Sequence, residues 1–230
     1  MDFIIEGILT AFKIIISLDA EFLGIVFTSI KVSLASIFIS AMVAIPLGIW
    51  VGVCRFKGRS LITTILNTLM SFPTVLIGLI FYSLLSRRGP FGELGLLFTQ
   101  TAMIIGQAVL AFPVIAALVS AGVNNLGNGA FVAARLLGAG RIKSGFLYLR
   151  EAKFIVITSV LAAFGRVFSE IGISMMLGGN IRFYTRNITT AIALETSRGA
   201  FGLGIALGLV LLLVAFMINI IACPVRERYV

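Results

Sequence analysis

Histidine is absent from this chain of 230 residues, cysteine occurs twice, and charged residues make up only 12% of the sequence. Without histidine, the chain lacks the commonest metal ligand and the usual proton relay near neutral pH. Soluble domains carry about 25% charged residues, so the scarcity of charge argues against a soluble fold. Cys54 and Cys223 are too few for a disulfide framework, and we expect both to be inert packing residues.

The sequence also lacks the usual signs of an enzyme. No phosphate-binding Gly-x-x-x-x-Gly-Lys-Ser/Thr loop occurs in it, so we do not expect this chain to hydrolyse ATP. We find no grouping of nucleophile, base and oxyanion donors, and no metal-ligand spacing. The sequence therefore predicts a protein that is not an enzyme, with no catalytic residues, no metal and no cofactor.

Long uncharged segments are what the sequence has in abundance. Residues 32–54, 60–86, 94–134 and 199–225 contain no charged side chain, and each exceeds the roughly 20 residues that span a bilayer core. Strands of a membrane barrel would instead run for about 10 residues with alternating polarity. We therefore predict one all-α membrane domain over residues 1–230, with about five transmembrane helices at 23–54, 60–86, 94–122, 153–177 and 202–223.

The segment before the first predicted span differs from the others. Residues 3–18 are too few to cross a bilayer, and they include Glu6 and Lys13. We expect them to form an amphipathic helix that lies at the membrane interface.

Basic residues predict how the chain crosses the membrane, because lysine and arginine concentrate in cytoplasmic loops. One side of the predicted bundle carries ten of them: Arg55, Lys57, Arg59, Arg135, Arg141, Lys143, Arg150, Lys153, Arg226 and Arg228. The other side carries six: Lys13, Arg87, Arg88, Arg182, Arg186 and Arg198. The excess places the C-terminus in the cytoplasm and the N-terminus outside. Because the net charge of +9 then serves orientation, we expect no nucleic-acid partner.

Proline and hydroxyl residues meet near the middle of the second predicted span. The run Ser71-Phe72-Pro73-Thr74-Val75 places two hydroxyls beside a residue that lacks a backbone donor. Proline is common in membrane helices, where neighbours satisfy the freed backbone groups, so one proline alone indicates little. Ser71, Pro73 and Thr74 together favour a bent helix that lines a pathway.

The fourth predicted span contains two charges. Arg166 and Glu170 are four residues apart, which puts them on one helical face. Charges at membrane depth are costly and usually pair or face an aqueous cavity. Two interpretations remain open: the pair locks helix packing, or it belongs to a translocation path or its gate.

The predicted cytoplasmic loop, residues 123–152, begins with a turn-rich segment and then indicates two short helices broken at Gly138-Ala139-Gly140. Its run Val132-Ala133-Ala134-Arg135-Leu136-Leu137-Gly138 resembles the loop with which permeases of ABC importers dock into their ATPase. Val132, Tyr148 and Arg150-Glu151 depart from that pattern, and an ordinary amphipathic loop is the alternative. The resemblance implies that the coupling residues are Ala133, Ala134, Gly138, Ala139 and Arg141.

A polar run follows the fourth span. The segments Gly178-Gly179-Asn180-Ile181-Arg182, Thr185-Arg186 and Thr189-Thr190-Ala191-Ile192-Ala193-Leu194-Glu195-Thr196, together with Arg166 and Glu170, resemble the permeases for sulfate, molybdate and tungstate, and those for tungstate most of all. The resemblance implies a type I importer permease in the cytoplasmic membrane that moves a tetrahedral oxyanion. Its implied partners are separate ATPase subunits, an external oxyanion-binding protein and a second copy of itself.

A dianion that sheds water needs hydroxyl, amide and backbone donors along its route and few fixed cations that would trap it. We therefore add Asn180 to the expected path, and Arg182, Thr185 and Arg186 to an external mouth that attracts anions. Contact of these arginines with the binding protein is the other interpretation. A permease for phosphate or a neutral amino acid, or an ion-coupled transporter without an ATPase, remain the alternative functions.

Overall fold

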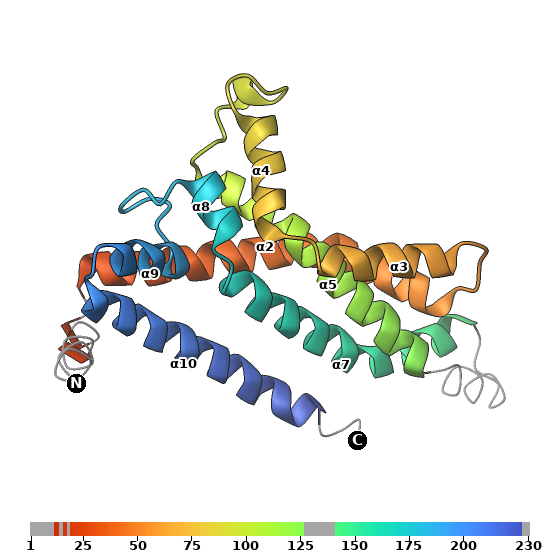
Figure 1. Ribbon diagram of the computed structural model, residues 1–230. Helices are drawn as coiled ribbons and strands as arrows, with labels where there is room; N and C mark the ends of the chain where they lie inside the picture. The colour runs from red at the N-terminus through yellow and green to blue at the C-terminus, as the bar shows by residue number, and fades with distance from the viewer. Residues whose placement is uncertain (1–11, 14–15, 18, 127–140, 227–230) are drawn as a thin grey trace.

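The computed structural model describes residues 12–13, 16–17, 19–126 and 141–226, and this part of the chain is helical without strands (Figure 1). The helices are α2 (Ala20–Val53), α3 (Arg59–Met70), α4 (Thr74–Leu85), a 3-10 turn (Gly92–Leu94), α5 (Gln100–Leu126), α7 (Arg141–Phe168), α8 (Gly172–Gly178), α9 (Ile188–Ser197) and α10 (Phe201–Arg226). Most of the expected interfacial helix at 3–18 lies outside the described residues. So do the expected coupling residues Ala133, Ala134, Gly138 and Ala139.

Three of these helices, α2, α5 and α10, are long and apolar enough to cross a membrane. Two helix pairs, α3 with α4 bent by 92° and α7 with α8 bent by 60°, are also apolar enough to cross a membrane if each pair is counted as one span. The five spans predicted from hydropathy are therefore present when each bent pair counts as one span. The bend that Ser71, Pro73 and Thr74 predict in the second span is present, whereas the sequence prediction did not include the break within the fourth span.

The second half of the loop at 123–152 also differs from the prediction. Arg141 begins α7, which continues without interruption to Phe168. Residues 141–152 therefore extend the fourth span and do not form a separate short helix. Nothing between Arg141 and Phe168 ends a helix, since neither proline nor a turn-forming glycine pair occurs there.

Close contact between α2 and α5 builds the centre of the bundle. A Cβ atom at Gly48 would lie 2.8 Å from the Ala116 carbonyl oxygen, and one at Gly52 would lie 2.7 Å from Val123 Cγ1. Small residues let membrane helices approach this closely, and van der Waals packing then holds them together. α5 is buried over most of its span, whereas α10 lies at the periphery with its apolar side chains exposed. That exposure suits a helix surrounded by lipid.

The α2–α3 turn is tied to α5 by one side chain. Arg59 Nη2 donates to the Gly52 carbonyl oxygen at 3.1 Å and to Asn124 Oδ1 at 2.8 Å. The first contact satisfies a carbonyl at the end of α2, where the helix itself supplies no donor. The Arg59 clamp therefore joins three helices at one end of the bundle.

We expect Arg59→Gln to destabilise the protein by about 1–2 kcal/mol, because two hydrogen bonds from a charged donor are lost. Thermal unfolding in detergent, followed by intrinsic fluorescence, measures the change. Arg55→Gln is the matched control, since Arg55 is exposed in the same turn. Equal melting temperatures for the two variants would contradict the clamp.

Candidate functional site

The first helix break lies between α3 and α4. The amides of Ser71 and Phe72 turn back to the carbonyls of Thr68 and Leu69 at 3.1 and 3.2 Å, which closes the last turn of α3. Pro73 has no N–H to continue the helix, and it is the N-cap of α4 with φ −62° and ψ 120°. Pro46 and Pro113 lie inside unbroken helices. Of these three prolines, Pro73 alone marks a break.

The second break, at residues 169–171, lies between α7 and α8. Glu170 is 3% exposed, and its Oε1 accepts a hydrogen bond from the Ile173 amide at 3.3 Å, in the first turn of α8. A carboxylate satisfies a free amide at the start of a helix and is favoured there by the helix dipole. Glu170 therefore caps the helix that follows the break.

The two breaks are in contact. A Cβ atom at Gly172 would lie 3.1 Å from Val75 Cγ2, 3.2 Å from Glu170 Oε1 and 3.3 Å from Thr74 Oγ1. Glycine is the residue that fits this space without displacing a neighbour. The hydroxyl of Thr74 and the carboxylate of Glu170 thus approach the same point from two bent spans, α3–α4 and α7–α8.

An ion pair adjoins this contact. Arg166 Nη1 lies 3.8 Å from Glu170 Oε2, and the Arg166 side chain is 44% exposed. The pairing expected from their four-residue spacing is therefore present. Five of the residues predicted for the path thus lie at or beside the two breaks: Ser71, Pro73, Thr74, Arg166 and Glu170.

A buried polar network connects the second break to its neighbours. Gln107 Nε2 on α5 donates to Ser174 Oγ on α8 at 3.0 Å, and Asn187 Nδ2 donates to the same oxygen at 2.9 Å. Thr189 Oγ1 lies within hydrogen-bond distance of the Glu170 carbonyl oxygen, at 2.8 Å. Each of these side chains is buried, and together they join α5, α8 and α9 around Glu170.

Our sequence prediction did not include this network. The signal that could have indicated it is Gln107, the one amide in the apolar run 101–122. An amide placed there needs a partner, because an unpaired polar group in an apolar environment is costly. Its partners are Ser174, 67 residues further along the chain, and Ser36, 71 residues before it, and the sequence does not indicate either of them.

Residues 179–187 form a folded loop and not an open polar stretch. Gly179, Asn180 and Phe183 have positive φ values of 67°, 51° and 61°. Thr185 is fully buried; its hydroxyl donates to the Gly178 carbonyl and accepts from the Ile181 amide at 2.9 Å. Thr185 therefore closes the loop, although the sequence had placed it at an external mouth. Asn180 lies beyond α8, away from the two breaks.

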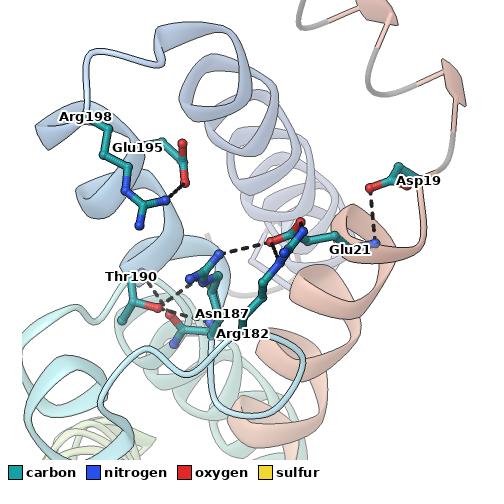
Figure 2. Close-up of polar contacts among 8 residues, drawn as sticks. Asp19, Glu21, Arg182, Asn187, Thr190, Glu195 and Arg198 are labelled. Carbon is teal, nitrogen blue, oxygen red and sulfur yellow. Dashed lines mark hydrogen bonds and ion pairs between the residues drawn. The ribbon is translucent and has the colours of Figure 1, made fainter.

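The two arginines of this loop, Arg182 and Arg186, are both paired with Glu21 in the first turn of α2. Figure 2 shows Arg182 beside Glu21. Arg182 donates through Nε and Nη2, and Arg186 Nη1 lies 3.0 Å from Glu21 Oε1. By accepting the hydrogen bond, Glu21 raises the pKa of Arg182 above its usual value. The expected mouth cations thus share a counter-ion, and they anchor the loop to α2.

Helix α9 begins directly after this loop. The Asn187 side chain accepts from the Thr190 amide at 2.9 Å, and the Thr190 hydroxyl accepts from the Asn187 amide at 3.1 Å (Figure 2). This reciprocal capping box satisfies donors that the helix leaves free. It also fixes Asn187, whose Nδ2 reaches Ser174. The polar side chains of the run seen in the sequence therefore largely cap helix α9 and hold the 179–187 loop in its fold.

Comparison with known proteins identifies the family. A family model described as "Binding-protein-dependent transport system inner membrane component" matches residues 44–223. The chain belongs to this family. The expected membership of the sulfate, molybdate and tungstate permeases is confirmed, and the helical bundle is the type I permease fold.

Named relatives cover nearly the whole chain. It is 41% identical over 228 residues to the tungstate uptake system permease protein TupB of Peptoclostridium acidaminophilum, covering 99% of this chain and 100% of the relative. It is also 41% identical to TupB of Campylobacter jejuni, covering 99% of this chain and 95% of the relative. The molybdenum transport system permease protein ModB of Escherichia coli K12 is 28% identical, over 83% of this chain and 90% of the relative. The names of these relatives are those of transport permeases, and the family identifies this chain as a multi-pass, binding-protein-dependent transport component of the membrane.

Proposed function

We propose that this permease carries tungstate across the cytoplasmic membrane as part of an ATP-driven importer. The observation that carries the proposal is the 41% identity over 99% of the chain to two tungstate uptake permeases. Identity falls to 28% for the molybdenum permease and 26% for a sulfate permease. Tungstate, molybdate and sulfate are tetrahedral dianions, so the route would have the same chemistry for all three.

In this proposal, the helix breaks form a gate in the route. Ser71 and Thr74 supply hydroxyls at the first break, and the buried carboxylate of Glu170 approaches the same point as the Thr74 hydroxyl. An anion would be repelled by Glu170 unless Arg166 stays paired with it. In the proposal, movement of the bent spans therefore changes both the width of the route and the charge that the anion meets.

Partners complete the proposed importer. The loop at 123–152 docks on an ATPase subunit through Ala133, Ala134, Gly138, Ala139 and Arg141. A second copy of the chain forms the other half of the route, and an external binding protein delivers the oxyanion near residues 179–187. ATP binding would then push the docked loops and rock one bundle against the other.

Reconstitution tests the cargo. The permease, its ATPase and its binding protein are placed in proteoliposomes, and ATP hydrolysis is measured with tungstate, molybdate or sulfate. We expect tungstate to stimulate hydrolysis at the lowest concentration. Stimulation by sulfate at lower concentrations than tungstate would contradict the assignment, and a binding protein loaded with no oxyanion serves as the baseline.

The orientation is tested by cysteine labelling in a background with Cys54→Ser and Cys223→Ser. Lys57 and Arg88 are both exposed, and they lie at opposite ends of the second span. An impermeant maleimide added to intact cells is expected to label Arg88→Cys and not Lys57→Cys, because ten of sixteen loop cations place residue 57 inside. Labelling of residue 57 alone would invert the topology.

A further inference from the structure

Helix α3 has three distinct faces, which follow from 100° of rotation per residue. Ile62, Leu66 and Met70 pack against the buried cluster around α5. Leu61, Ile65 and Leu69 form a second face, apolar and exposed by 65%, 47% and 37%. The third face, which we call the hydroxyl–amide face, consists of four exposed polar residues: Thr64, Asn67, Thr68 and Ser71. Their spacing of three, four and seven residues aligns them on one side.

Lipid suits the second face but not the third. An amide or hydroxyl in hydrocarbon without a hydrogen-bond partner costs several kcal/mol, about 4–8 on a cyclohexane scale. Thr68 Oγ1 donates to the Thr64 carbonyl oxygen at 2.8 Å. Among the described residues, the side chains of Thr64, Asn67 and Ser71 form no hydrogen bond. The hydroxyl–amide face therefore needs water or a polar ligand against it.

The position of this face relates it to the gate. It ends at Ser71, where α3 breaks before Pro73 and Thr74, and it runs from there toward Arg59 at the α2–α3 turn. After Arg59, α3 contains no charged residue. The face thus offers hydroxyls and one carboxamide in series, with donors for an anion and no cation that would hold it permanently.

We propose that the hydroxyl–amide face lines a water-filled stretch of the route, and that Asn67 Nδ2 and the Thr64 and Ser71 hydroxyls donate hydrogen bonds to the passing tetrahedral oxyanion. This inference rests on the proposed function and extends it to α3, where the sequence prediction included only Ser71. A dry contact between two copies of the chain through the same face is the competing arrangement, and the test below distinguishes the two.

Cysteine accessibility tests the face in proteoliposomes that contain the permease with its ATPase and binding protein. Thr64→Cys, Asn67→Cys and Thr68→Cys are compared with Leu61→Cys, Ile65→Cys and Leu69→Cys, all in the Cys54→Ser, Cys223→Ser background. A charged methanethiosulfonate reagent is present on both sides of the bilayer. We expect the three polar positions to react at least about tenfold faster than the three apolar ones, because thiolates form in water and not in lipid. Tungstate should slow the reaction at the polar positions.

Uniform reaction rates at the six positions would overturn the proposal. So would unreactive polar positions that instead form spontaneous disulfides between two copies, which indicates the dry contact. Tungstate uptake by the same proteoliposomes distinguishes failure of the pore-lining inference from failure of the proposed function. If tungstate is imported while the polar positions stay unreactive, the face is wrong and the proposed function stands. If these positions react but tungstate neither protects them nor is imported, the cargo is wrong.

A substitution series gives an independent readout. Asn67→Leu is expected to reduce tungstate uptake at least about tenfold, whereas Asn67→Gln, which keeps the donor, retains most of it. Leu61→Ala on the apolar face is the control and should leave uptake unchanged. Full uptake by Asn67→Leu would contradict the proposed hydrogen bond to the anion.

Discussion

Replacement of Glu170 by leucine is expected to lower the melting temperature by about 5–10 °C, since the buried Ile173 amide loses its acceptor at a cost of about 1–3 kcal/mol. Glu170→Gln keeps an oxygen for that amide and loses only the charge. We expect this variant to melt close to the unsubstituted protein. The two substitutions therefore separate the helix cap from the ion pair.

Transport measurements on Glu170→Gln then decide the role of the pair with Arg166. If the charge belongs to the gate, tungstate uptake falls about tenfold or more, the factor that about 1.4 kcal/mol produces in a conformational equilibrium. Normal uptake and normal stability together would show that the ion pair contributes neither to gating nor to helix packing. Glu93→Gln is the control, because Glu93 is an exposed carboxylate in the 3-10 turn.

Exchanging Arg166 and Glu170 is not expected to restore full stability. Placing arginine at 170 and glutamate at 166 restores opposite signs, but the arginine then faces the first amides of α8 and cannot accept the Ile173 hydrogen bond. We therefore expect the double exchange to remain less stable than the unsubstituted protein. The spacing of the two residues in the sequence gives no indication of this asymmetry.

Two glycine-to-alanine substitutions in α2 are expected to have opposite effects on the free energy of unfolding. At Gly48 the new Cβ would lie 2.8 Å from a backbone oxygen of α5, so the helices must separate. We expect a loss of about 1–3 kcal/mol, the range observed for overpacked cores. At Gly24 nothing lies within 4 Å of the added atom, and alanine should stabilise the helix by up to about 1 kcal/mol.

Thermal unfolding of both variants in the same detergent measures the difference. The Gly24 variant is the matched control, because it makes the identical chemical change in the same helix. A Gly48→Leu variant extends the series, and we expect it to yield little folded protein. If both alanine variants melt above the unsubstituted protein, then α2 and α5 do not pack as closely as described.

Hydropathy and residue spacing were sufficient to predict much of the fold. Uncharged runs longer than a bilayer crossing predict spans, and four residues between Arg166 and Glu170 predict a pair on one face. Pro73 beside two hydroxyls predicts a break. These are local properties, because each depends on residues within a few turns of one helix.

Long-range geometry could not be predicted in the same way. Glu21 meets Arg182 across 161 residues, and a sequence with many possible carboxylate–arginine pairs does not specify that one. The 92° angle between α3 and α4 depends on what α4 packs against, namely α8. Thr185 resembles a donor for a ligand in the sequence, yet its hydrogen bonds go to the protein itself.

The anchoring of residues 179–187 to Glu21 has a mechanical consequence. α2 is an unbroken rod of 34 residues, about 51 Å long at 1.5 Å per residue. Glu21 is fastened to the loop at its first turn, and the Gly52 carbonyl is fastened to Arg59 at its last. A force on the loop would thus be transmitted along this one helix to the start of α3 at its other end, without passing through the proposed gate at the helix breaks.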